Sequence, residues 1–191
     1  MSQIIIGLHG LARTGKDTLA KHLAAHFALY SYAFADPLKQ ALAQLFNLNQ
    51  AQLEGAEKEH LIDWLGKSPR QLMQLLGTEW GRDRVHPELW LLLAEQNISH
   101  TLNGDQSFYA GVVVRDVRFE NEAEWIRAKG GTVVHILRPD AQKVAQHRSE
   151  SGLNIHDNDL VIHNDASLAE LYNQAELLMQ TLKQRALKRA A

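Results

Sequence analysis

Cysteine is absent from the 191 residues, which excludes disulfide bonds and thiolate metal sites and fits a cytoplasmic location. No apolar run approaches the ~20 residues that a membrane-spanning helix needs, so no membrane association is expected. Charge of one sign is not in excess either, because 20 Lys and Arg balance 22 Asp and Glu to a net charge of −2. That balance lacks the signature of a surface that binds nucleic acid. The ten histidines are scattered, without the spacing of a zinc site.

A glycine-rich stretch near the N-terminus is the most informative motif that the sequence does contain. Residues 10–18 read GLARTGKDT and stand between the apolar run 4–8 and an amphipathic pattern over 15–28. Glycines let backbone N–H groups approach phosphate oxygens, and the helix that follows directs its N-terminus at the same anion. Lys16 adds a positive charge that reaches the terminal phosphates. The stretch therefore predicts a nucleoside triphosphate site, against the structural alternative of a plain turn between a strand and a helix.

One position departs from the usual phosphate loop. The residue after the lysine is commonly Ser or Thr, whose hydroxyl binds Mg²⁺, whereas here it is Asp17, followed by Thr18. A carboxylate is also a good ligand for Mg²⁺, directly or through water. Its negative charge weakens the affinity for phosphate unless the metal or Arg13 compensates. We therefore expect Asp17 to take part in holding Mg²⁺.

Short apolar runs alternate with helical patterns along the chain. Strands are expected at 4–8, 30–34, 110–114, 132–137 and 160–163, and helices at 15–28, 37–46, 119–129 and 168–188. Continuous apolar runs suit strands buried on both faces. The alternation predicts an α/β fold of three layers, α/β/α, around a five-stranded parallel sheet, similar to the phosphate-loop nucleoside triphosphate hydrolases.

The length of the chain predicts one domain over 1–191. The stretch between the second and third expected strands is too long for a simple crossover, so 47–108 is expected to form a helical insert. This insert would bind a second ligand, the acceptor of a phosphoryl group. The polar stretch 139–159 is expected to serve as a cover over the phosphates.

Charged or hydrogen-bonding residues follow every expected strand, at the edge of a parallel sheet where ligands bind. They are the phosphate loop, Asp36 and Lys39, the segment Arg115-Asp116-Val117-Arg118, Arg138, and Asn164 with Asp165. Asp116 is similar to the acidic residue that helps to hold Mg²⁺ in phosphate-loop enzymes, and its alternative role is to cap the helix over 119–129. Glu120, Glu122 and Glu124 lie in the opening turns of that helix, where they complement its dipole, and most of them are expected to face solvent.

Within the insert, Ser68-Pro69-Arg70-Gln71 predicts a helix start, with Ser68 at the N-cap and proline at the first helical position. Arg70 then lies in the first turn, where its guanidinium and the unpaired backbone N–H groups could hold a second phosphate. A solvent-facing arginine is the alternative. By the same signals, Asp36-Pro37 predicts an N-cap and a first-position proline for the helix over 37–46.

Several further segments, taken with the phosphate loop, resemble those of the deoxynucleoside monophosphate kinases of tailed bacteriophages. They are the GKDT ending of the loop, Pro37-Leu-Lys39, Leu72-Met-Gln-Leu-Leu-Gly77-Thr78, Asp116-x-Arg118 with Glu122, Gly130-Gly-Thr-Val-Val-His-Ile-Leu-Arg138-Pro139, Glu150-Ser-Gly-Leu153 and Asp159-Leu-Val-Ile-His-Asn164-Asp165-x-Ser167-Leu. The resemblance covers nearly the whole chain, and that family also has Asp after the loop lysine. The insert is shorter here than in those relatives.

This resemblance implies a reaction like that of adenylate kinase, in which ATP with Mg²⁺ phosphorylates a deoxynucleoside monophosphate to the diphosphate. It implies that ATP is held by Gly10, Arg13, Thr14, Gly15, Lys16, Asp17 and Thr18. The acceptor is expected against Leu38, Lys39, Arg70, Gly77, Thr78, Trp90, Asp116 and Arg118. Catalysis would rest on Lys16, Arg13 and Asp116, and the metal would be held by Asp17 and Asp116.

Two other functions remain open from the residues alone. Another small-molecule kinase with a phosphate loop, of the dephospho-coenzyme A or phosphomevalonate type, would share the loop and the sheet. A regulatory module that binds and slowly hydrolyses ATP would show turnover without any monophosphate. The paired basic groups favour the kinase. The expected partners are small molecules only, and the sequence leaves a homodimer open.

Overall fold

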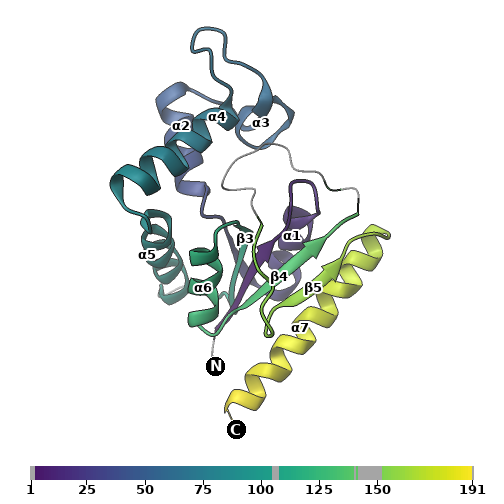
Figure 1. Cartoon of the computed structure of the whole chain (residues 1–191). Helices are drawn as coiled ribbons and strands as arrows, with labels where there is room; N and C mark the ends of the chain where they lie inside the picture. Colours follow the sequence, from purple (N-terminus) through teal and green to yellow (C-terminus); the bar gives the residue numbers. More distant parts are fainter. Residues whose placement is uncertain (1–2, 105–107, 140, 142–151, 191) are drawn as a thin grey trace. The chain divides into compact units, whose positions relative to one another are not determined.

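A computed structural model describes residues 3–104, 108–139, 141 and 152–190 of the chain. The chain divides into two compact units, one made of Met1–Ala33 and Ile98–Ala191, the other of Phe34–Asn97. The first contains the sheet, and the second is helical (Figure 1). The second unit begins before the insert expected over 47–108, because it includes the helix that follows the second strand. Of the cover expected over 139–159, residues 140 and 142–151 lie outside the described part.

The sheet of the first unit has five parallel strands, as the apolar runs predict. They are β1 (Ile4–His9), β2 (Leu29–Tyr32), β3 (Gly111–Val117), β4 (Thr132–Leu137) and β5 (Leu160–His163). Their order across the sheet is β2-β3-β1-β4-β5, and every neighbouring pair is parallel. β1 is therefore the central strand, and the phosphate loop leaves the sheet from its middle.

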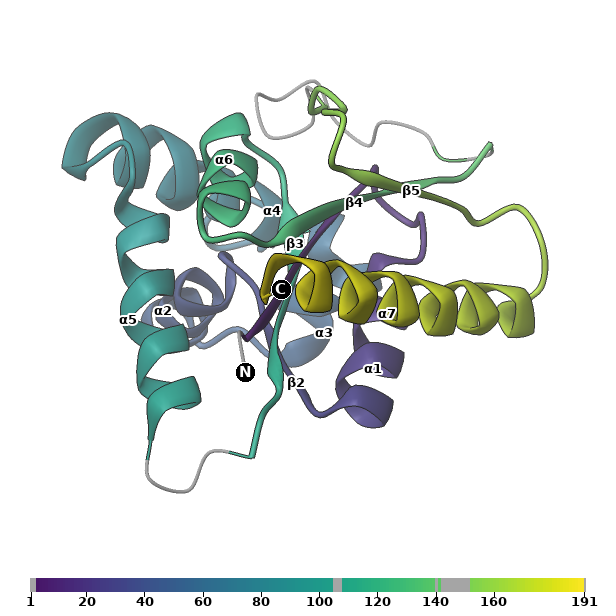
Figure 2. The same cartoon turned by 90° about the horizontal axis from the view of Figure 1, so that it is seen from below.

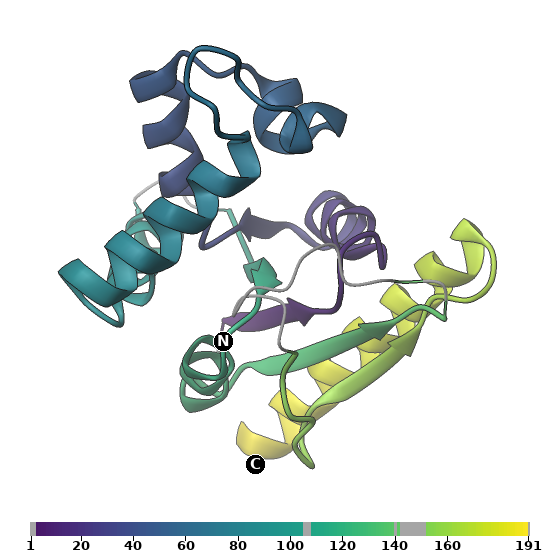
Figure 3. The same ribbon diagram turned by 45° about the horizontal axis from the view of Figure 1, so that its top comes forward.

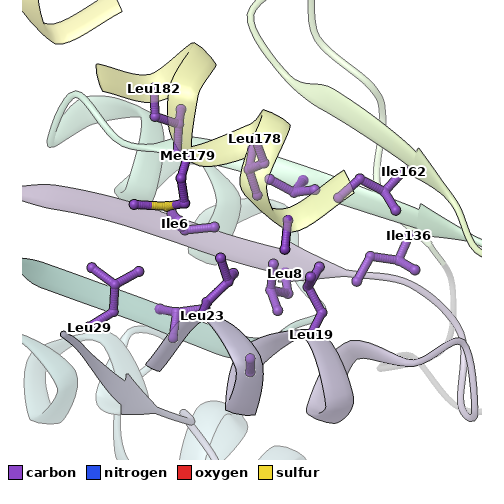
Figure 4. Close-up of a cluster of buried hydrophobic side chains, with 14 of the residues drawn as sticks. Ile6, Leu8, Leu19, Leu23, Leu29, Ile136, Ile162, Leu178, Met179 and Leu182 are labelled. Carbon is purple, nitrogen blue, oxygen red and sulfur yellow. The ribbon is translucent and has the colours of Figure 1, made fainter. Parts of the chain in front are cut away.

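Helices cover both faces of this sheet. α1 (Lys16–Phe27) and α7 (Leu168–Ala190) lie on one face, and α6 (Glu120–Ala128) lies on the other (Figures 2 and 3). Between α1, α7 and the sheet lies an apolar core that draws on all three elements, including Ile6, Leu8, Leu19, Leu23, Ile136, Leu178 and Met179 (Figure 4). Burial of this core is the main contribution to the stability of the unit. The three-layer prediction is confirmed.

β3 differs from its prediction in length and regularity. The expected strand ended at residue 114, but β3 continues to Val117. Gly7 pairs with Val114 while His9 pairs with Val117, so two residues of β1 face three of β3. The extra residue is a β-bulge, which bends a strand and changes the direction of its side chains. Arg115 and Asp116 lie within this bulge.

The second unit is built from short helices. They are α2 (Asp36–Phe46), α3 (Gln50–Glu54), the 3₁₀-helix η1 (Ala56–Glu59), α4 (Pro69–Gln74) and the π-helix η2 (Leu75–Val85), followed by the start of α5 (Leu89–Asn103). The helix start predicted at Ser68 is confirmed, since its side chain accepts from the backbone N–H of Gln71. The N-cap predicted at Asp36 is wrong, because α2 already begins at Asp36 and Ala35 occupies the N-cap position.

None of the helices among the described residues combines the length and the apolar character that crossing a membrane requires.

Candidate active site

The phosphate loop joins β1 to α1 and is shaped by two glycines. Gly15 has a φ of 98°, in the left-handed region, and a Cβ atom there would lie 2.5 Å from Nδ2 of Asn164. A Cβ atom on Gly10 would lie 2.6 Å from the carbonyl oxygen of Ile136. A side chain at either position would push the loop away from β4 or from the residue that follows β5. The sequence places glycine at both positions because the backbone must pass this closely.

Lys16 is the first residue of α1, and its ammonium group lies across the loop. Its Nζ donates to the carbonyl oxygens of Gly10 at 2.7 Å and Leu11 at 2.6 Å. Thr14 is buried, and its hydroxyl donates to the same Leu11 carbonyl at 2.9 Å. These bonds hold the loop in one shape and keep a full positive charge against it. An anion at the N-terminus of α1 would be stabilised by this charge and by the helix dipole.

Arg13 and Asp17, the two charged side chains flanking this lysine, are both exposed. Arg13 has a φ of 64°, a conformation that is uncommon for a residue other than glycine. The side chain of Asp17 is 75% exposed, and its Oδ1 lies 3.9 Å from Nη1 of Arg115. Arg115 therefore links β3 to the start of α1, whereas the sequence indicates only that it is one of the charged residues after the third strand. Thr18, the last residue of the motif, is half-buried in the first turn of α1.

Asn164, directly after β5, fixes the loop from the other side. Its side-chain Nδ2 donates to the carbonyl oxygen of Thr14 at 2.9 Å, and its backbone N–H donates to the carbonyl oxygen of Leu137. The sequence places Asn164 among the residues at the ligand-binding edge of the sheet, but it does not predict the contact of this side chain with the loop. The available signal was its position at the end of a strand, where ligands and the residues that shape their sites gather.

Asp116 lies inside β3 and is half-buried. Its alternative role as a helix cap is wrong, because α6 begins at Glu120 and the N-cap position falls on Phe119. The capping function belongs instead to Glu122, whose carboxylate accepts from the backbone N–H groups of Arg118 at 2.7 Å and Phe119 at 3.1 Å. Glu122 is therefore the exception among the three glutamates of which most are expected to face solvent, since only 2% of it is exposed. Its use as an acceptor for orphan N–H groups explains its burial.

A buried ionic network lies on the face of the sheet that α6 covers. The carboxylate of Asp159 accepts two hydrogen bonds from Arg127, one from the backbone N–H of His156 and one from Nε2 of His135, at 2.7–3.1 Å. Burial alone would raise the pKa of Asp159, but these hydrogen bonds and the charge of Arg127 outweigh it and lower the pKa to about 2. Arg127 also donates to Glu120 at 3.0 Å. The network fastens the segment before β5 to α6 and β4.

The two cations expected to hold the acceptor are each paired with a carboxylate in the second unit. Nζ of Lys39, on α2, lies 2.6 Å from Oε1 of Glu54. Nε of Arg70, in the first turn of α4, donates to Oε1 of Glu59. Both carboxylates are more exposed than the cations that they hold. A phosphate could replace either one as the acceptor of these N–H groups.

Four of the other residues expected around the acceptor lie on the π-helix or on the helices α2 and α5 of the same region. Trp90 is buried, and its indole Nε1 donates to the carbonyl oxygen of Gly77 at 2.7 Å. Leu38 is buried and lies beside Gly77, with its Cδ2 3.5 Å from where a Cβ atom would stand. Thr78 is also buried. π-helical segments are frequent at functional sites. The structure therefore brings Leu38, Gly77 and Trp90 together, while the indole N–H of Trp90 is engaged with the backbone.

A separate apolar hollow of about 430 Å³ lies in the second unit. It is lined by Leu42, Leu45, Phe46, Leu72, Leu75, Leu76, Glu79, Trp80 and Arg84. None of the residues expected around the acceptor lines it, so this hollow does not support their placement.

The described residues contain no group of three His, Cys, Asp or Glu side chains that could hold a metal ion by themselves. Mg²⁺ usually binds one or two carboxylates and completes its shell with phosphate oxygens and water, so a pair of aspartates is a suitable donor set for it. Asp17 and Asp116 are the two carboxylates that the loop and the bulge supply.

Known proteins resemble this chain in sequence and in fold. The model of the family described as "Deoxynucleotide monophosphate kinase" matches residues 4–67 and 57–175. A protein of Acanthamoeba polyphaga mimivirus, provisionally named as a deoxynucleotide monophosphate kinase, is 34% identical over 189 residues, covering 90% of this chain and 93% of the relative. The deoxynucleotide monophosphate kinase of Enterobacteria phage T4 is 28% identical over 242 residues, covering 93% of this chain and 99% of the phage protein.

Among solved structures, a sugar kinase from Janibacter sp. aligns with a TM-score of 0.51 at 15% identity, over 93% of this chain and 95% of that one. This likeness concerns the fold alone. The sequence matches run from β1 to α7 and take in the phosphate loop, the β3 bulge and the π-helix. The chain belongs to the deoxynucleotide monophosphate kinase family.

Proposed function

We propose that this protein transfers the terminal phosphoryl group of ATP to a deoxynucleoside monophosphate and releases the diphosphate. Membership of the family supports the acceptor class. The observation that carries the donor assignment is the phosphate loop at the end of the central strand, with the Lys16 ammonium held across it. Phosphoryl transfer depends on positioning and charge neutralisation more than on covalent chemistry, and the loop offers both.

For the donor, we assign ATP to Gly10, Arg13, Thr14, Gly15, Lys16, Asp17 and Thr18. The loop N–H groups and the N-terminus of α1 would bind the phosphates, and Lys16 would exchange its two carbonyl partners for phosphate oxygens. Arg13 is exposed and adds a second positive charge that can follow the transferred group.

For the metal, we assign Asp17 and Asp116 as the protein ligands of Mg²⁺, directly or through water. When bound, Mg²⁺ neutralises charge on the donor phosphates and orients them for transfer. Arg115 stands beside Asp17 and limits the repulsion between that carboxylate and the phosphates.

For the acceptor, we assign the residues that the resemblance implies. Arg70 and Lys39 would bind the monophosphate by replacing Glu59 and Glu54 as their partners. Leu38, Gly77 and Thr78 would contact the nucleoside, and Trp90 would act by holding the carbonyl group of Gly77 in place. Asp116 and Arg118 are the contacts that we assign to the first unit.

The competing functions predict different acceptor profiles. A kinase of the dephospho-coenzyme A or phosphomevalonate type would leave deoxynucleotides unused, and a regulatory module would release ADP at the same rate without any acceptor. A coupled assay of ADP formation with dGMP, dTMP, dCMP, dAMP, the ribonucleotides and the two other acceptors separates the three. We expect turnover that depends on a deoxynucleoside monophosphate.

The decisive variant is Lys16→Ala. We expect kcat to fall at least ~10²-fold, because this charge is needed at the transferred phosphoryl group. Lys21→Ala removes an exposed lysine from the same helix and serves as the matched control, with kcat unchanged. Thermal unfolding of both variants checks that the fold is retained. Normal turnover in a folded Lys16→Ala protein would refute the donor assignment.

A further inference from the structure

The two faces of the sheet differ where the strands approach the phosphate loop. Toward α1 and α7, β1 and β4 present Ile6, Leu8, Val134 and Ile136 to the apolar core. The alternate residues point to the α6 side, and there His9 and His135 lie with their ring centroids 5.2 Å apart. Histidine in the middle of a sheet has an energetic cost unless its ring nitrogens are hydrogen-bonded. Nε2 of His135 is hydrogen-bonded to the carboxylate of Asp159. The question is which group bonds His9.

His9 is hydrogen-bonded to the β3 bulge. Its Nδ1 lies 2.9 Å from the carbonyl oxygen of Val117. A carbonyl oxygen only accepts, so Nδ1 carries the proton and donates. Burial lowers the pKa of His9, as do the charges of His135, Lys16 and Arg118, while the hydrogen bond to Val117 opposes them. The lowered pKa favours the neutral ring, and the carbonyl acceptor requires the tautomer with hydrogen on Nδ1.

Two observations show that the bulge at this bond changes the direction of the β3 side chains. In a regular strand, Val113 and Val117 would share a face, because they are four residues apart. Val113 belongs to the core under α1 and α7, whereas Val117 lies beside Gly7 and Ile126 on the α6 side. The change occurs across Arg115, whose Nη1 lies 3.9 Å from Oδ1 of Asp17, and Asp116, which we assign to the metal and the acceptor.

We infer that His9 is a positioning residue for phosphoryl transfer, because its Nδ1–H bond to Val117 holds the β3 bulge in the form that presents Arg115 and Asp116 to the phosphate loop. A bulge leaves backbone groups of the strand without their usual hydrogen-bond partners on the neighbouring strand. The His9 side chain provides such a partner for the carbonyl oxygen of Val117. His9 directly precedes Gly10, so the same residue ends the central strand, begins the loop and anchors its neighbour. The inference rests on the proposed roles of Lys16 and Asp116.

The test compares side chains of nearly equal size at position 9. Asn places an amide N–H near the position of Nδ1, whereas Leu has a similar volume and no donor. We expect His9→Leu to lower kcat roughly ten- to a hundredfold with KM for ATP changed less than about threefold, and His9→Asn to restore most of kcat. His9→Leu and Asp116→Asn should be non-additive in kcat, because one acts through the other.

Arg127→Met is the stability control, since it removes the two hydrogen bonds that Arg127 donates to Asp159 on the same face of the sheet and leaves the His9 side chain in place. It should lower the melting temperature while kcat stays within about twofold. If His9→Leu does not fold, His9→Gln is used in its place. The amide group of Gln reaches the position of Nε2 and not that of Nδ1, so kcat should fall as it does when the donor to Val117 is removed.

Equal kcat in His9→Asn and in the variant that lacks the donor would overturn the inference. So would a loss of kcat in the donor-lacking variant that is no greater than the loss in Arg127→Met, when the two variants have the same melting temperature. Full activity in His9→Leu beside inactive Lys16→Ala and Asp116→Asn would remove the inference and leave the proposed function standing. Normal activity in folded Lys16→Ala and Asp116→Asn would remove the proposed function itself.

Discussion

At the scale of single residues, the carboxylate in place of the usual hydroxyl after the loop lysine has a measurable consequence. If Asp17 and Asp116 hold Mg²⁺, Asp17→Asn and Asp116→Asn should each raise the Mg²⁺ concentration for half-maximal rate several-fold. The double variant should show less than the product of the two effects, because both act on one ion. A Mg²⁺ titration of the initial rate measures this. Asp63→Asn, an exposed carboxylate of the second unit, is the control, and identical titration curves in all variants would give both aspartates structural roles only.

Arg70 and its partner Glu59 give a second prediction for single residues: replacing Arg70 should raise the KM for the acceptor, and replacing Glu59 should lower it. Arg70→Ala removes a charge-assisted contact worth about 1.5–3 kcal/mol, so KM for the acceptor should rise roughly ten- to a hundredfold while KM for ATP stays nearly unchanged. Glu59→Gln removes the group that competes with the acceptor phosphate, so the acceptor KM should fall, by less than about fivefold for an exposed pair.

Steady-state kinetics with each substrate varied in turn decides the role of Arg70. Arg70→Lys should restore only part of the affinity, because a point charge cannot replace a planar donor pair. Lys67→Ala, an exposed cation of the same unit, should change neither KM. A rise in the KM for ATP instead would mean that Arg70 serves the donor.

At the scale of elements, the buried Asp159 carboxylate attaches the segment before β5 to α6 and β4 through its hydrogen bonds with Arg127 and His135. The pKa of Asp159 in the folded protein is about 2, below its ordinary value of 3.8, so the unfolded chain binds the proton more readily. The ionised Asp159 side chain therefore contributes about 2 kcal/mol to the free energy of unfolding. This contribution is complete above about pH 4 and disappears as the pH falls toward 2.

Asp159→Asn tests this linkage. The variant should be less stable than the wild type at pH 7, and the difference in unfolding free energy should shrink between pH 4 and pH 2. Urea unfolding at a series of pH values measures both. A difference that stays constant over this range would assign the loss to packing and not to the charge.

The elements also show what a sequence can predict and what it cannot. Apolar runs located all five strands, and the local cap at Ser68 was found because its partner, Gln71, is three residues away. The β3 bulge was missed because it depends on register with β1, more than one hundred residues earlier. The Asn164 contact with the loop and the burial of Glu122 depend in the same way on tertiary structure. The phosphate loop is readable because its chemistry lies within nine consecutive residues.

At the scale of the whole molecule, the central place of β1 has a consequence for how the protein is made. β1 leaves the ribosome before the other strands of the sheet, but its two neighbours begin at Gly111 and Thr132, and Asn164 reaches the loop later still. At a synthesis rate of about ten residues per second, β1 has no neighbouring strand to pair with for roughly ten seconds. During that interval the nascent chain exposes a surface that chaperones recognise. A chain released before residue 164 would carry the complete nucleotide motif without the contact that gives it its shape.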